Sequence, residues 1–175
     1  MWLPLAGIGM VSAAHGVQYH TTESVQRLLF PQAQSFAAQT MLLTPVQRNH
    51  IEQAANVKVR DAKLNAWEVL GPNGRQGWLL IDEVLGKHDL ITYAVALNAQ
   101  GTILGIEIMT YRETYGGQIN DARWRDQFKG KTTKDALKIE TDIQNISGAT
   151  LSCQHVTDGV RRLVSTWQMA LASQP

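Results

Sequence analysis

A run of small and hydroxyl-bearing residues, from Ile146 to Ser152, directly precedes the most regular apolar pattern in the sequence. Apolar residues from Leu151 to Ala172 recur at three-and-four spacing, which predicts a long helix that begins within this run. The first N–H groups of a helix lack intrahelical partners and lie at the positive end of its dipole, so they favour an anion. After Thr150 the first acidic residue is Asp158. The run therefore predicts an anion-binding site around Thr150.

A simpler interpretation of the same run stays open. Ser and Thr most often accept a hydrogen bond from the first turn of a helix, so Ser147 or Thr150 could act only as the helix cap.

The elements that must position this run indicate an α+β domain. Thr21 or Thr22 can cap a short helix that stops at Phe30, before a proline, and Thr44 begins a capping box for a second helix that runs to about Ala55. From Asn65 to Tyr111, runs rich in Ile, Val, Thr and Tyr alternate with turn sequences, which predicts an antiparallel meander. We expect one domain over residues 17–175, in which this sheet packs with helices and a long C-terminal helix ends the chain.

Composition and spacing argue against several function classes. The chain has 175 residues and a formal charge of +1 without a basic run, so it lacks the surplus of positive charge that a nucleic-acid-binding protein uses. The five histidines form no metal-binding motif, and no nucleophile-elbow or P-loop sequence is present. The single cysteine, Cys153, is expected to be a buried thiol. We therefore expect no nucleic acid, no metal and no hydrolase chemistry.

The N-terminal segment MWLPLAGIGMVSAA is apolar and uncharged, and polar residues follow it. It is too short to span a bilayer of about 30 Å but fits the apolar region of a signal peptide. Ser12 with Ala14, or Ala14 with Gly16, provide small residues for cleavage. We expect residues 1–16 to be a signal peptide of an exported protein; the alternative is a buried N-terminal helix or strand.

The sequence Ser147-Gly148-Ala149-Thr150-x-Ser152 resembles the flavinylation motif of the FMN-binding domain family, which includes the flavin-carrying extracytoplasmic subunits of the Rnf and sodium-pumping NADH:quinone reductase complexes. Four further stretches resemble the family in the same order: Gly86 to His88, Tyr111 to Gly117, Trp124 with Gln127 to Lys131, and Gly159 to Arg161. The likeness covers roughly residues 75 to 165. One departure bears on the efficiency of attachment: the family pattern has Asp three residues before the Ser, where this chain has Gln144, with Asp142 two residues earlier.

The resemblance implies that a flavin transferase joins FMN to Thr150 through a phosphoester. The resulting diester would place about one negative charge on the free N–H groups of the helix start. Gly148 and Ala149 would allow a close approach of the backbone, and Leu151 would offer an apolar contact to the rings, while Ser147 and Ser152 complete the motif. The flavin would carry the redox chemistry, so no catalytic acid or base is expected.

The resemblance also implies flavin contacts outside the motif. Residues 113–116 match the family stretch that lies beside the isoalloxazine, namely Glu113, Thr114, Tyr115 and Gly116; their alternative is a strand that ends in a Gly-Gly turn. Lys87 and His88 could place positive charge near the flavin and favour its reduced form, or could form a solvated turn.

Trp124 and Phe128 could stack on the flavin or simply belong to the core, since aromatic residues four apart on a helix usually pack together. We expect Arg161 and Arg162, three turns into the last helix, to be exposed.

These inferences predict an exported flavoprotein that passes electrons between membrane-associated redox partners, at the periplasmic or other extracytoplasmic face of a membrane. Two alternatives remain: a flavin- or ligand-sensing module that regulates a membrane partner, and a flavin-free structural subunit with a degenerate motif.

Overall fold

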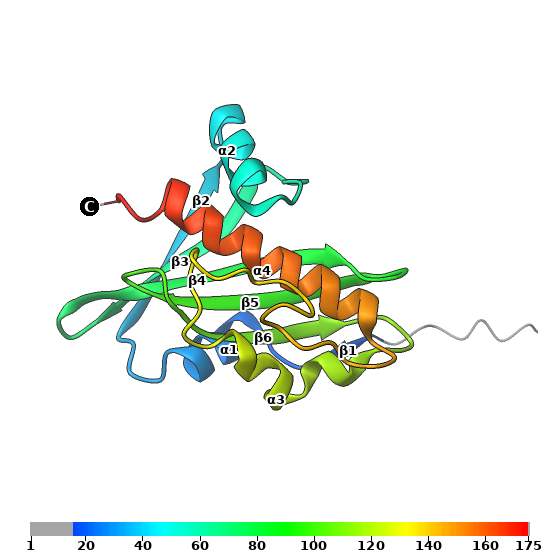
Figure 1. Ribbon diagram of the computed structural model, residues 1–175. Coiled ribbons are helices and arrows are strands. Elements are labelled where there is room, and N and C mark those ends of the chain that lie inside the picture. Colours follow the sequence, from blue (N-terminus) through cyan, green and yellow to red (C-terminus); the bar gives the residue numbers. More distant parts are fainter. Residues whose placement is uncertain (1–15, 175) are drawn as a thin grey trace, which may run out of the picture.

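Six antiparallel strands form one sheet, in the order β1-β6-β5-β4-β3-β2, in the computed structural model, which describes residues 16–174 (Figure 1). The strands are β1 (Val17–Gln18), β2 (Ser35–Leu42), β3 (Lys63–Gly71), β4 (Gly74–Leu85), β5 (Leu90–Asn98) and β6 (Ile103–Tyr111). The predicted meander is confirmed as β3 to β6, in which each strand pairs with the next. The sequence interpretation missed β2, which pairs along the edge of β3. The predicted signal peptide, apart from its last residue, lies outside the described residues.

The helices are α1 (Thr22–Leu29), α2 (Pro45–Ala55), α3 (Ala122–Arg125) and α4 (Thr150–Ala170), with 3-10 turns η1 (Gly117–Asn120) and η2 (Asp126–Phe128). Thr21 caps α1 and Thr44 caps α2, and both caps are capping boxes in which the cap residue and the residue three places later bond reciprocally. The predicted long C-terminal helix is confirmed as α4. In residues 16–174 we find no helix that combines the length and the apolar character needed to cross a membrane.

The helices cover the two faces of the sheet unequally, which confirms the α+β class. α4 lies across one face, with α2 beside it, and this side holds the larger apolar cluster, which joins Trp78 and Val95 of the sheet to Val156 and Val160 of α4 (Figure 1). The other face has a smaller cluster around Val25 of α1. Because α4 is packed along its length, its first turn is held in a fixed position relative to the strand ends.

The predicted exposure of Arg161 and Arg162 is wrong. The side chain of Arg162 is 10% exposed and forms an ion pair with Asp82 of β4, whose carboxylate also accepts a hydrogen bond from the Tyr93 hydroxyl at 3.1 Å. Arg161 donates to the carbonyl oxygens of Ala55 and Leu137, each at 2.7 Å. Both arginines are covered because α4 is flanked by the sheet, by the end of α2 and by the segment before α4.

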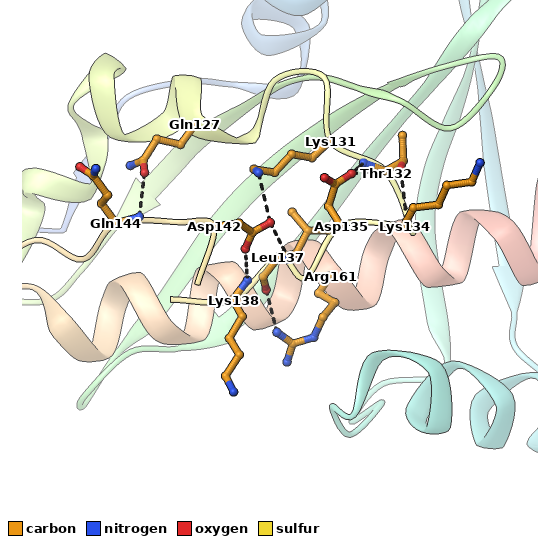
Figure 2. Close-up of polar contacts among 10 residues, drawn as sticks. All are labelled: Gln127, Lys131, Thr132, Lys134, Asp135, Leu137, Lys138, Asp142, Gln144 and Arg161. Atoms are coloured by element: carbon orange, nitrogen blue, oxygen red, sulfur yellow. Dashed lines mark hydrogen bonds and ion pairs between the residues drawn. The ribbon is translucent and has the colours of Figure 1, made fainter. Parts of the chain in front are cut away.

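The segment from Lys131 to Asp142 has little regular structure, and side chains fix its path into α4 (Figure 2). The carboxylate of Asp142 lies 3.1 Å from the Lys131 ammonium and accepts from the amides of Leu137 at 3.1 Å and Lys138 at 2.8 Å. Burial raises the pKa of Asp142, but these amides and the ammonium outweigh that effect and hold the pKa below its usual value. The segment is therefore an ordered connection.

Candidate functional site

The first turn of α4 carries no cap. Its N-cap residue is Ala149, no side chain caps it, and its first turn contains no acidic residue. The capping interpretation of Ser147 and Thr150 is therefore wrong. The first bond of the helical ladder runs from the Cys153 amide to the Ala149 carbonyl at 2.9 Å, which leaves the preceding amides without intrahelical acceptors. The helix start thus keeps the anion-binding character that the sequence predicts.

The Thr150 side chain is exposed, and its Oγ1 accepts a hydrogen bond from the Asn145 side-chain amide at 3.1 Å. Its own hydroxyl proton has no acceptor within residues 16–174. The neighbouring residues of the motif divide into two sets. Ser147, Gly148 and Leu151 are exposed, whereas Ala149 and Ser152 are buried. The reactive hydroxyl therefore faces outward from a helix start that is anchored on its inner side.

The stretch from Tyr111 to Gly116 contacts this helix start directly. The Tyr111 hydroxyl donates to the Tyr115 carbonyl and lies 2.9 Å from the Ser152 hydroxyl, which must therefore be the donor of that second bond. Gly116 has a φ of +90°, and a Cβ placed on it would lie 2.5 Å from the Tyr111 hydroxyl oxygen and 3.5 Å from Cα of Ala149. The structure thus brings residues 115 and 116 to the start of α4, although they are far from it in the sequence.

Glu113 joins the turn between β4 and β5 to the same end of the molecule. Its Oε1 accepts from the amides of His88 at 2.6 Å and Asp89 at 3.0 Å. Burial raises the pKa of Glu113, but the amides of Asp89 and His88 more than compensate and lower it overall. The carboxylate is therefore committed to holding this turn, while the side chains of Lys87 and His88 remain exposed.

Thr114 and Tyr115 are exposed at this end of the sheet, and the Tyr115 side chain is 83% exposed. An apolar ring of this exposure is available to a ligand as a contact. It is also free of the backbone interactions that fix Glu113.

Trp124 lies in the core. It is 3% exposed and packs edge-to-face on Phe128, with ring centroids 5.2 Å apart. Its Nε1 donates to the Gln144 carbonyl at 2.9 Å, and the Gln144 amide donates to Oε1 of Gln127 at 2.7 Å (Figure 2). The interpretation of Trp124 as a residue that stacks on the flavin is wrong, because its ring is enclosed; instead it fixes the backbone two residues before Ile146. The Gln144 side chain itself is exposed.

Three residues of the site were not predicted from the sequence as contacts: Asn145, which donates to Thr150, Tyr111, which bonds to Ser152, and Gln127, which holds Gln144. Tyr111 and Gln127 lie in stretches that resemble the family, so the signal was present for both. Asn145 stands out in the sequence only as part of an Asn-Ile-Ser glycosylation pattern, which gives no indication of its bond to Thr150.

The geometry of this site is that of a flavin-phosphate-binding domain, and comparison with known proteins agrees. Residues 86–165 match the family described as FMN-binding domain. This part of the chain belongs to that family, and the match includes every candidate site residue from Lys87 to Ser152.

Two known proteins are similar to the chain. One component of the Na(+)-translocating ferredoxin:NAD(+) oxidoreductase complex of Acetobacterium woodii is 35% identical over 81 residues, which are 41% of this chain and 39% of that component. The chain therefore matches well under half the length of this relative. The crystal structure of NqrC from Shewanella oneidensis superposes with a TM-score of 0.52 at 20% identity, over 86% of this chain and 75% of that one, and shows a shared fold.

The residues at the start of α4 fit FMN. The uncapped amides suit a phosphate, the Thr150 hydroxyl is exposed, and Gly148, with a φ of +84°, has nothing within 4 Å of a Cβ position, so the backbone can be approached closely. Leu151, 47% exposed, offers an apolar surface next to Thr150. FMN bound there supplies reversible uptake of electrons, and the protein supplies binding, orientation and charge.

Proposed function

We propose that this chain is an electron-transfer flavoprotein that carries FMN covalently on Thr150. The observation that carries the proposal is the start of α4: an uncapped, acid-free helix terminus with an exposed threonine hydroxyl. Attachment replaces the O–H bond of Thr150 with an O–P bond to the phosphate of FMN, and the proton leaves with the departing group of the donor that the transferase uses. The remaining negative charge of the diester is then stabilised by the helix amides.

The chain's own residues have distinct positions in this proposal. Asn145 holds the Thr150 oxygen at 3.1 Å and so orients it before attachment. Tyr111 and Ser152 fix the Gly116 turn against the helix start, and this turn forms one wall for the cofactor. Exposed Lys87 and His88 add positive charge at the same end of the sheet, which favours a reduced, anionic flavin.

The partners and the location belong to the same proposal. The Acetobacterium woodii relative is named as part of a Na(+)-translocating oxidoreductase complex, which supports membrane-associated redox proteins as electron donor and acceptor. The apolar, uncharged N-terminal segment supports export. We therefore propose that a flavin transferase modifies the exported domain and that it works at the extracytoplasmic face of a membrane.

Co-expression with a flavin transferase tests the attachment. The wild-type protein is expected to retain flavin fluorescence after denaturing electrophoresis and to gain the mass of one FMN, whereas Thr150→Ala is expected to show neither. Thr114→Ala is the matched control, because it removes an exposed threonine hydroxyl near the site outside the motif, and it should remain labelled. A wild-type protein without covalent flavin in the transferase-containing host would refute the attachment.

Reoxidation kinetics test the electron-transfer role. The flavin-loaded, reduced protein should be reoxidised rapidly by a membrane acceptor such as a quinone or a cytochrome. Slow exchange with all such acceptors would contradict the role of electron carrier and would favour a sensing module.

A further inference from the structure

A cavity of about 630 Å³ lies between the segment that follows α2, the end of β4 and the middle of α4. It exists because β3 pairs with β4 only as far as Ile81, so residues 82–85 of β4 border an opening in place of a neighbouring strand. Its volume is within the range of small-molecule sites, roughly 300–1,000 Å³. None of the candidate flavin residues lines it, so it is separate from the site around Thr150.

A buried polar network stands at this cavity. Arg162, which lines it, is ion-paired with Asp82, and Asp82 is also bonded to the Tyr93 hydroxyl. The Nε of Arg162 and the Nδ1 of His155, also a lining residue, are buried without a hydrogen-bond partner. A buried ion pair of this kind contributes little to stability compared with apolar packing, so a packing role alone does not account for it.

The lining groups are unequally satisfied. Each carboxylate has a partner: Asp82 pairs with Arg162, Asp158 with Arg161 at 2.8 Å, Asp61 with the Lys63 amide at 2.8 Å, and Glu83 with the Thr92 hydroxyl at 2.8 Å. By contrast, the guanidinium of Arg60 and the ammonium of Lys63 have no partner within residues 16–174. The cavity therefore offers hydrogen-bond donors and positive charge that the protein does not use itself.

The remaining lining is apolar. Val57, Val84, Leu85 and Leu90 contribute side chains, and Leu85 and Leu90 stay 42% and 40% exposed. A ligand that covers them would gain from burial of apolar surface. Apolar walls with a few unsatisfied donors are the usual composition of a small-molecule site.

We propose that this cavity binds a small molecule in which an apolar ring carries carbonyl or carboxylate oxygens. The ring packs against Val84, Leu85 and Leu90, and the oxygens accept hydrogen bonds from Arg60 and Lys63. Quinones and aromatic carboxylates share this chemistry. The site does not depend on whether Thr150 carries flavin.

The test is an NMR titration of the full chain, expressed without a transferase, in two arms: 2-methyl-1,4-naphthoquinone and 1-naphthoate. Saturable shifts of the amides of Val57, Val84 and His155, without shifts at Thr150 or Gly116, are expected with at least one probe. A response to the quinone alone or to the naphthoate alone identifies the source of the oxygens. The absence of saturable shifts at these amides with both probes would overturn the proposal.

Variants test the assignment of the donors. The double variant Arg60→Gln/Lys63→Gln, in which both residues are exposed and unpaired, should bind at least about tenfold more weakly. Lys134→Gln removes an exposed lysine outside the cavity and should bind as the wild type does. Equal affinity of the double variant and this control would refute the ligand chemistry. Thr150→Ala should keep full binding, so a failure here is distinguishable from a failure of the flavin proposal.

Discussion

Replacing Gly116 with alanine tests how tightly the Tyr111–Gly116 stretch is packed on the start of α4. At a φ of +90°, an alanine costs about 1–2 kcal/mol for a left-handed backbone. Its Cβ would also lie 2.5 Å from the Tyr111 hydroxyl and 3.2 Å from Oγ of Ser152, and overpacking of this kind costs typically about 1–3 kcal/mol. Gly116→Ala should therefore lower the free energy of unfolding by about 2–5 kcal/mol.

Gly148→Ala is the matched control. It has a similar φ of +84°, but nothing lies within 4 Å of its Cβ position, so it should cost only the backbone part, about 1–2 kcal/mol. Urea unfolding of both variants measures the difference. Tyr111→Phe in the Gly116→Ala background removes the nearest clash and should reduce the cost of the alanine. If Gly116→Ala is no more destabilising than Gly148→Ala, the inferred contact between this turn and α4 is refuted.

Three further outcomes follow from the packing and the charges. The pKa of Glu113 is lowered in the fold, so its contribution to stability is complete above its ordinary pKa of 4.5 and is lost as pH falls through the folded value; the stability difference between wild type and Glu113→Gln, followed by chemical unfolding, should shrink in acid. Gly159→Ala should destabilise despite a helix-propensity gain of about 1 kcal/mol, because its Cβ would lie 2.9 Å from Cζ of the fully buried Tyr93 and closer still to the hydroxyl; thermal unfolding reports the sign. Asp142→Asn should cost about 1–3 kcal/mol in chemical unfolding and speed amide exchange in the segment before α4, because it weakens the Lys131 ion pair and two backbone bonds; unchanged exchange would contradict an ordering role.

The elements defined by local chemistry were predicted correctly from the sequence. The capping box at Thr44 needs only residues three apart, and the meander needs only its turns and runs of β-forming residues. β2 was missed because it is an edge strand in which most side chains are exposed or half-buried, so it shows little hydrophobic alternation. α3 spans four residues and is too short for a periodic pattern.

The site was predictable only as a set of separate pieces. The motif around Thr150 and the Glu113–Gly116 stretch are local patterns, but their contact through Tyr111 and Ser152 joins residues 41 positions apart. The burial of Arg162 could not be inferred either, because its partner Asp82 lies 80 positions away on another element. Trp124 and Arg162 show that an aromatic or charged residue type does not indicate exposure until its partners are known.

The missing cap of α4 leads to a final prediction. In the same chain α1 and α2 have complete capping boxes, whereas α4, the longest helix described, begins at Ala149 without a side-chain cap or an early acid. Leaving such a terminus uncapped costs about 1 kcal/mol compared with a Ser, Thr or Asp cap. A diester at Thr150 would supply the absent negative charge and recover about 0.3–1 kcal/mol. The flavinylated protein should therefore be more stable than the same protein without flavin, and part of this gain should disappear at high salt, where charge interactions near the surface are screened. Ring contacts do not share this salt dependence, so a gain that is unchanged between low and high salt would show that the phosphate charge does not lie on the helix amides.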